Sequence, residues 1–99
     1  MRVFNRRTLL DACAKHAPAA EALRAWWAEA DKARWASIAD VRADFPSADR
    51  VADRIIFNIK GNKYRLVVAY DFPRHSLFIK FFGTHAEYDK VDVAKVNQS

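Results

Sequence analysis

The feature that most constrains this chain is a Gly61-Asn62 pair between two runs of alternating apolar residues. Such a pair is typical of the centre of a tight β-hairpin turn, and the turn fixes which residues of the two strands face each other. Counting outward places Arg65 opposite Asn58 on one face and Leu66 on the other. Because a slip of one residue would exchange the two faces, the turn also predicts which side chains are buried.

A second loop, closed over residues 73–76, predicts a third strand that pairs with the second. This loop sets Phe72 opposite Leu77, Tyr70 opposite Ile79 and Val68 opposite Phe81. The predicted apolar face of the meander consists of Ile55, Phe57, Ile59, Tyr64, Leu66, Val68, Tyr70, Phe72, Leu77, Ile79 and Phe81. The opposite face combines apolar residues with Arg54, Asn58, Lys60, Lys63, Arg65 and Lys80. A sheet that packs helices on one face and leaves the other open has this pattern.

The positive charge of the chain is concentrated on this meander. The sequence has 17 basic and 12 acidic residues, and six of the basic residues but only one acidic residue lie between Arg54 and Lys80. The remainder is neutral, so the meander carries the whole formal charge of +5. A basic sheet face favours a polyanionic partner such as nucleic acid, although charge alone is a weak indication.

The first half of the chain predicts helices that would cover the apolar face. Residues 2–4 suit a short strand at the edge of the sheet, and Asn5 is a candidate N-cap for a helix over residues 6–16. Pro18 suits the first turn of a second, alanine-rich helix that runs to about residue 35. Ser37 with Asp40 resembles a capping box for a short helix to residue 44. We therefore expect an α+β fold in one domain over residues 1–99.

The single cysteine and the three tryptophans have plain structural interpretations. Cys13 lies on an apolar helix face and is more typical of a small packed side chain than of a nucleophile. Trp26 belongs to the apolar stripe of the second helix, whereas we expect Trp27 and Trp35 to be partly exposed. No apolar run approaches the roughly 20 residues of a transmembrane helix, so a cytoplasmic protein without membrane contact is expected.

The residues that can carry chemistry follow the last predicted strand. The segment Gly83-Thr84-His85-Ala86-Glu87-Tyr88-Asp89-Lys90 gathers a histidine, a tyrosine, two carboxylates and a lysine at the end of the basic sheet. The three histidines of the chain have no metal-ligand spacing, and with only two glycines no phosphate-binding loop is present. Acid–base chemistry beside positive charge, without a metal or cofactor, is what this segment predicts.

That combination suits cleavage of an RNA backbone, because RNA supplies its own nucleophile, the 2′-hydroxyl. The protein then needs a base, an acid and a cation that stabilises the phosphate in the transition state. His85 and Tyr88 are candidates for proton transfer, and Arg65 and Lys63 for holding the phosphate. Each also has an ordinary alternative: His85 as a capping or packed histidine, Tyr88 as a packed ring, and the two cations as a solvated sheet face.

The segments FNIKGNKYRLVVA (residues 57–69) and FFGTHAEYDK (residues 81–90) together resemble the HigB family of bacterial toxins. The preceding segment, with Trp35, Ser37, Phe45, Pro46 and Ala48-Asp49, is also similar. The resemblance implies a RelE-like fold, in which N-terminal helices pack on one face of a small antiparallel sheet. It further implies the toxin of a type II toxin–antitoxin pair, an mRNA interferase that cuts translated messages on the ribosome and leaves a 2′,3′-cyclic phosphate.

The partner implied by the resemblance is a HigA-like helix-turn-helix antitoxin, and a heterotetramer with that antitoxin is one assembly that such a pairing allows. Positions that match the family motifs indicate Arg65, His85, Tyr88 and Lys90 as catalytic residues, with Asp89 orienting His85 or another group. We expect Arg54, Lys60, Lys63 and Lys80 to contact the RNA backbone, the last on the register argument alone. Two alternatives stay open: a non-catalytic module that binds RNA or the ribosome and blocks translation, and an inactive toxin that only binds its antitoxin.

Overall fold

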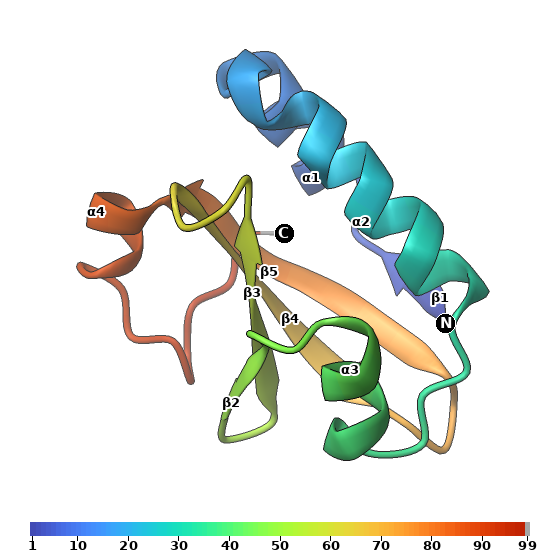
Figure 1. The fold of residues 1–99 in the computed structure, drawn as a ribbon. Coiled ribbons are helices and arrows are strands. Elements are labelled where there is room, and N and C mark those ends of the chain that lie inside the picture. The colour runs from blue at the N-terminus through green and yellow to red at the C-terminus, as the bar shows by residue number, and fades with distance from the viewer. Residues whose placement is uncertain (99) are drawn as a thin grey trace.

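A computed structural model describes residues 1–98 of the chain. Its centre is a five-stranded sheet in the order β1-β5-β4-β3-β2 (Figure 1). The strands are β1 (Arg2–Phe4), β2 (Asp49–Val51), β3 (Arg54–Ile59), β4 (Tyr64–Asp71) and β5 (Ser76–Thr84). The edge strand β1 pairs parallel with β5, and all other neighbours are antiparallel. The edge strand at residues 2–4 is therefore confirmed, whereas β2 was not predicted.

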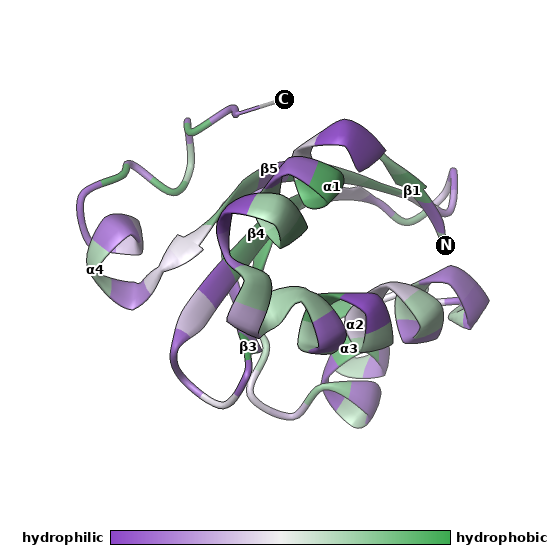
Figure 2. Cartoon of the chain, turned by 90° about the horizontal axis from the view of Figure 1, so that it is seen from above, coloured by the Kyte–Doolittle hydropathy of each residue, from purple (hydrophilic) through white to green (hydrophobic). Residues whose placement is uncertain are grey.

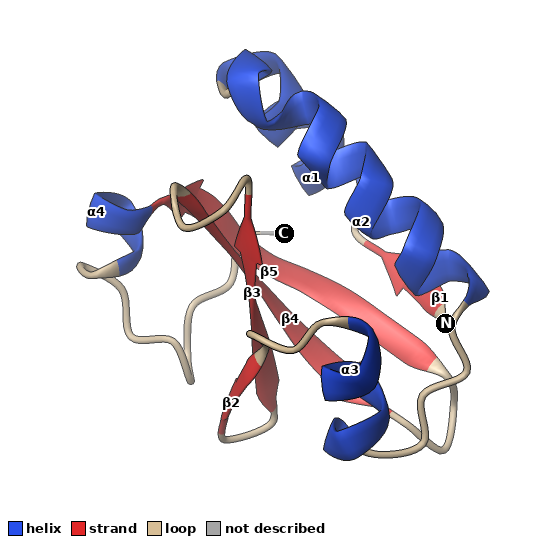
Figure 3. Ribbon diagram, in the orientation of Figure 1, coloured by secondary structure: helices blue, strands red, loops and turns tan. Residues whose placement is uncertain are grey.

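Three helices pack on one face of this sheet, which confirms the expected α+β, RelE-like arrangement (Figure 3). They are α1 (Arg6–Lys15), α2 (Ala20–Lys32) and α3 (Ile38–Asp44), and a 3₁₀ turn at Ala17–Ala19 holds Pro18. The helix α2 ends before the predicted residue 35, because the chain becomes extended at Ala33 (φ −69°, ψ 152°). Within residues 1–98, no helix is long and apolar enough to cross a membrane.

The helix starts agree with the predicted caps in position and differ in detail. Ser37 Oγ accepts a hydrogen bond from the Asp40 N–H at 3.3 Å, as an N-cap does. Asn5 precedes α1 in a left-handed conformation (φ 70°), but its side chain makes no cap. Its Nδ2 instead donates to the Ile79 carbonyl at 3.0 Å, and this bond ties the start of α1 to β5.

The main hydrophobic core lies between the helices and the sheet, where the apolar stripes of the amphipathic helices meet the strands (Figure 2). Trp26 is buried there, as predicted, and Trp27 is partly buried. The expectation that Trp35 is partly exposed is wrong, because only 2% of it is accessible. Its ring packs against Phe57 and its Nε1 donates to the Asp44 carboxylate at 2.9 Å. That hydrogen bond satisfies the one polar atom that would otherwise disfavour burial.

The register of the first hairpin is confirmed: Asn58 lies opposite Arg65 and Phe57 opposite Leu66. The turn places positive φ at Gly61 (66°) and also at Lys60 (55°). Leu66 is fully buried in the main core. The first hairpin therefore has the two faces that the sequence predicts.

The predicted register of the second hairpin is wrong. The strands pair Asp71 with Ser76 and Val68 with Ile79, so each predicted partner is displaced by two residues. A shift between Val67 and Val68 then leaves Lys80 as an extra residue in β5, which is a β-bulge. The bulge turns Phe81 to the face opposite the helices and brings Phe82 into the main core instead.

The face opposite the helices is not open along its whole length. A second, smaller hydrophobic cluster forms there around Ile56, Val67 and Phe81. It is covered by apolar side chains from the C-terminal segment, namely Tyr88, Val91, Val93 and Val96. Only the part of this face beyond the cluster is available for other contacts.

Candidate functional site

A short helix, α4 (His85–Tyr88), follows β5 without a loop and brings the chemistry-bearing residues to the sheet. A complete capping box fixes its start: Thr84 Oγ1 accepts from the Glu87 N–H at 3.2 Å, and the Glu87 carboxylate accepts from the Thr84 N–H at 2.8 Å. Gly83 permits the close approach of this helix. A Cβ at this position would lie 2.8 Å from the Phe81 ring and 3.0 Å from a Glu87 oxygen.

Glu87 also joins α4 to the C-terminal end of α1. Its carboxylate lies 3.7 Å from His16 Nε2 and 4.0 Å from Lys15 Nζ. The backbone hydrogen bond from Thr84, assisted by the Thr84 hydroxyl and more weakly by Lys15 and His16, holds the pKa of Glu87 below its ordinary value of 4.5. The ionised carboxylate therefore supports the position of α4 at neutral pH.

Arg65 is the cation at the centre of the candidate site. It lies in β4 between Asn58 of β3 and Gly83 of β5, on the face opposite the helices. Its guanidinium carbon is 5.6 Å from the centre of the Tyr88 ring, a cation–π distance. Its Nε is buried and has no hydrogen-bond partner among residues 1–98. Trp26 Nε1 and Arg54 Nε are in the same state, so it is the position of the Arg65 side chain at the edge of a hollow that suits it to an anionic ligand.

A hollow of about 260 Å³ lies beside the Arg65 guanidinium. It is lined by Ser47, Asp49, Ile56, Asn58, Arg65 and Tyr88. Ser47 and Asp49 were not predicted to belong to the site, because both precede the meander in the chain. The short strand β2 places Asp49 there by pairing with β3, and Ser47 lies just before β2 in the chain. The one feature of the sequence that could have indicated Ser47 and Asp49 is the similarity of the segment around them to HigB toxins.

His85 and Asp89 continue the site along α4. The His85 Nδ1 lies 3.3 Å from the Asp89 carboxylate, the geometry expected if Asp89 orients the imidazole. The centres of the His85 and Tyr88 rings lie 6.5 Å apart, edge to face. The backbone N–H of His85 donates to the Lys63 carbonyl at 3.1 Å. With Nδ1 facing a carboxylate, Nε2 is the nitrogen left for a substrate.

The structure thus brings three of the four predicted catalytic residues into contact through their side chains: Arg65 contacts Tyr88, and Tyr88 contacts His85. The fourth, Lys90, is exposed directly after α4. Among the predicted RNA contacts, Lys60 and Lys63 are exposed at the hairpin turn, and Lys80 is partly buried in the bulge of β5.

The prediction that Arg54 contacts RNA does not agree with its position. Its side chain is only 10% exposed, and its Nη1 donates to the carbonyls of Val93, at 3.1 Å, and of Val96. The guanidinium therefore holds the C-terminal segment against the sheet. Register placed Arg54 on the correct face, but the segment that covers it there was not predicted.

No group of three or more His, Cys, Asp and Glu side chains in residues 1–98 is arranged to hold a metal ion.

The search of curated proteins gives no match. A family model does match: HigB_toxin, described as the RelE-like toxic component of a toxin–antitoxin system, aligns with residues 19–91. The match covers most of the chain, including strands β2 to β5 and α4. The chain therefore belongs to the HigB family of RelE-like toxins, the toxic components of toxin–antitoxin systems.

Proposed function

We propose that this toxin is an mRNA interferase, an endoribonuclease that cleaves translated messages on the ribosome in the cytoplasm. The observation that carries the proposal is the contact series Arg65–Tyr88–His85–Asp89 beside a hollow on the basic face of the sheet. A module that only bound RNA would need the cations, but it would not need titratable side chains gathered next to them.

In the proposed reaction, the 2′-oxygen of one nucleotide attacks the adjacent phosphorus and the bond to the 5′-oxygen of the next nucleotide breaks. The products are a 2′,3′-cyclic phosphate and a 5′-hydroxyl. One group takes the proton of the 2′-hydroxyl and another protonates the departing 5′-oxygen. His85 and Tyr88 are the two candidates for these transfers.

Arg65 would stabilise the charge that builds on the phosphate oxygens. Its side chain lines the hollow, where the guanidinium could donate to a phosphate. Lys90 would contact the leaving group or the phosphate, and Lys60, Lys63 and Lys80 would contact the neighbouring backbone. We propose a HigA-like helix-turn-helix protein as the antitoxin.

The test is to induce this chain alone in bacteria and to map RNA 5′ ends on a reporter message with and without its start codon. The proposal predicts new ends inside the reading frame that vanish when translation is prevented. Cuts in both messages would indicate a nuclease that acts on free RNA. Growth arrest without cuts would indicate a translation-blocking module, and an absence of any effect an inactive toxin.

A further inference from the structure

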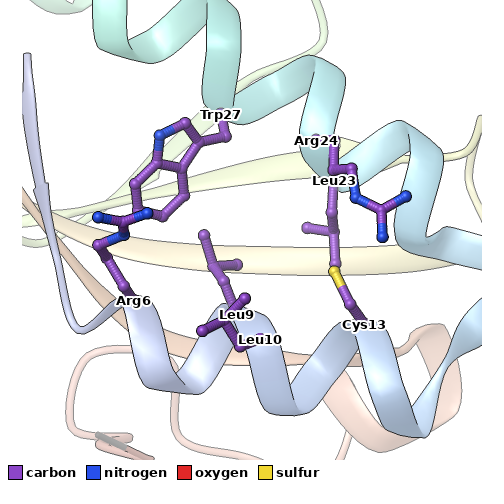
Figure 4. Close-up of a pocket in the computed structure, with 7 residues that line it drawn as sticks. All are labelled: Arg6, Leu9, Leu10, Cys13, Leu23, Arg24 and Trp27. Carbon is purple, nitrogen blue, oxygen red and sulfur yellow. The ribbon is translucent and has the colours of Figure 1, made fainter.

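A second hollow, on the helix side of the molecule, has no part in the proposed RNA site. It has a volume of about 260 Å³ and lies between α1 and α2 (Figure 4). Its lining residues are Arg6, Leu9, Leu10, Cys13, Leu23, Arg24 and Trp27. We call it the α1–α2 groove. It is smaller than the roughly 300–1,000 Å³ of ordinary small-molecule sites, so side chains of a protein partner suit it better than a separate metabolite.

The groove contains one strongly exposed apolar side chain. Leu10 is 64% exposed, the most exposed large hydrophobic residue among those that the structure describes. It stands on α1 next to Leu9, and Leu23 approaches Cys13 from α2 (Figure 4). Leu9 and Leu23 are themselves buried, so the apolar surface that reaches solvent here is that of Leu10 with the partly exposed Cys13 and Trp27. The hollow beside Leu10 can receive an apolar side chain of a partner.

Two arginines and no carboxylate line the groove. The Arg6 guanidinium lies 5.1 Å from the Trp27 ring at one end, and Arg24 extends past Cys13 at the other (Figure 4). Within residues 1–98 neither arginine forms an ion pair, so both can pair with a partner's carboxylates. A second copy of this chain would bring four arginines together, which disfavours self-association through the groove.

We infer that the α1–α2 groove binds an acidic amphipathic helix of the cognate antitoxin. Apolar side chains one turn apart on that helix fill the groove beside Leu10, and aspartates or glutamates that flank them pair with Arg6 and Arg24. The inference depends on the assignment of the chain as a toxin in one respect, namely that an antitoxin exists. Because the groove and Arg65 lie on opposite sides of the sheet, an antitoxin held here leaves the RNA face uncovered by this contact.

Cys13 makes a direct test possible, because it is the single cysteine of the chain and lines the groove. The full-length chain is treated with N-ethylmaleimide, alone and with one equivalent of the antitoxin encoded beside it. Alkylation of Cys13 should slow at least about tenfold in the complex. Unchanged alkylation in a verified complex would overturn the inference, as would equal protection by total RNA or by self-association of the chain.

Charge reversal tests the acidic character of the partner. The double variant Arg6→Glu/Arg24→Glu should weaken antitoxin binding at least about tenfold, whereas the matched control Arg7→Glu/Arg34→Glu, on exposed arginines outside the groove, should change it less than about threefold. Leu10→Glu should act like the first double variant. Equal effects of the two double variants would overturn the inference. If the chain binds the antitoxin through the groove but cleaves no RNA, the proposed nuclease activity is refuted and the inference about the groove still holds.

Discussion

The helix-covered face of the sheet and the face that carries Arg65 are formed by alternating residues of the same strands, but they differ in what covers them. On the helix side, three helices bury residues such as Leu66 and Ile79 completely. On the other side, a segment without long helices or strands covers the small cluster around Val67. Beyond that cluster, Arg65 remains half-buried next to a hollow.

This difference separates stability from chemistry along one backbone. A strand that alternates its residues can contribute to a packed core on one side and present cations on the other. The helix side then tolerates no charge, while the other side can hold a partly buried arginine whose Nε has no partner in residues 1–98. Substitutions at neighbouring positions should consequently have unlike effects.

The largest effect is expected at Leu66, which is fully buried against the helices. Leu66→Asp places an unpaired charge in the main core and should cost at least about 4 kcal/mol, enough to unfold a domain of this size. Circular dichroism and solubility on expression would report the loss. The control Leu66→Met, which nearly keeps the volume, should cost less than about 1.5 kcal/mol. A folded Leu66→Asp protein would refute the assigned faces.

The two clusters can be compared through one phenylalanine each. Phe57, in the main core, is 1% exposed and contacts Trp26, Trp35 and Phe45. Phe57→Ala should cost about 3–5 kcal/mol, whereas Phe81→Ala should cost less, about 2 kcal/mol, because the C-terminal segment can close the space. Urea unfolding measures both. Equal costs would mean that the segment packs as tightly as the helices do.

Removal of the Arg54 guanidinium should free the C-terminal segment without unfolding the sheet. Arg54→Ala deletes the hydrogen bonds to the Val93 and Val96 carbonyls, at a cost of about 2 kcal/mol. Hydrogen exchange should accelerate in the peptide over residues 91–98 and stay slow in β4. Arg54→Lys should restore part of the protection. Uniform acceleration across the sheet would show that Arg54 instead supports the whole fold.

The smallest effect concerns Glu87, whose pKa is lowered chiefly by the Thr84 N–H. A carboxylate with a lowered folded-state pKa contributes stability above its unfolded pKa, and that contribution is lost as pH falls through the folded value. The melting-temperature difference between wild type and Glu87→Gln should therefore be present near pH 6 and should shrink as the pH falls below the ordinary carboxyl pKa of 4.5. Because the side chain is 44% exposed, the difference should be small. A difference that does not change with pH would contradict this assignment.

Local patterns predicted much of this fold, and the misses have separate causes. The Gly61 turn fixed the first hairpin, but period-two alternation placed Phe81 in the main core and could not foresee a bulge at Lys80. Trp35 lies outside any helix, so helical spacing could not reveal its burial against Phe57. The burial of Trp35 depends on a contact between segments distant in sequence, which local periodicity does not report. The register of the second hairpin was missed because its loop spans residues 72–75 and not 73–76.

The candidate site was also predicted unevenly. Arg65, His85 and Tyr88 lie in segments whose residue types indicate chemistry. The helix α4 was not predicted, although Thr84 and Glu87 have the spacing of a capping box. Arg54 was placed on the correct face, yet its coverage depends on the return of the C-terminal segment. That segment has no regular apolar pattern, so its path could not be read from sequence.

The most direct test of the separation between the two faces is Arg65→Ala, measured for both stability and cleavage. Arg65 is half-buried on the face away from the helices, so its removal should leave the melting temperature within about 3 °C of wild type. Cleavage of a translated reporter should fall by about a hundredfold or more, because a phosphate-stabilising cation is lost. Arg74→Ala, which removes an exposed arginine of the second hairpin loop, should change neither quantity. A folded, fully active Arg65→Ala protein, or one that unfolds, would contradict the account.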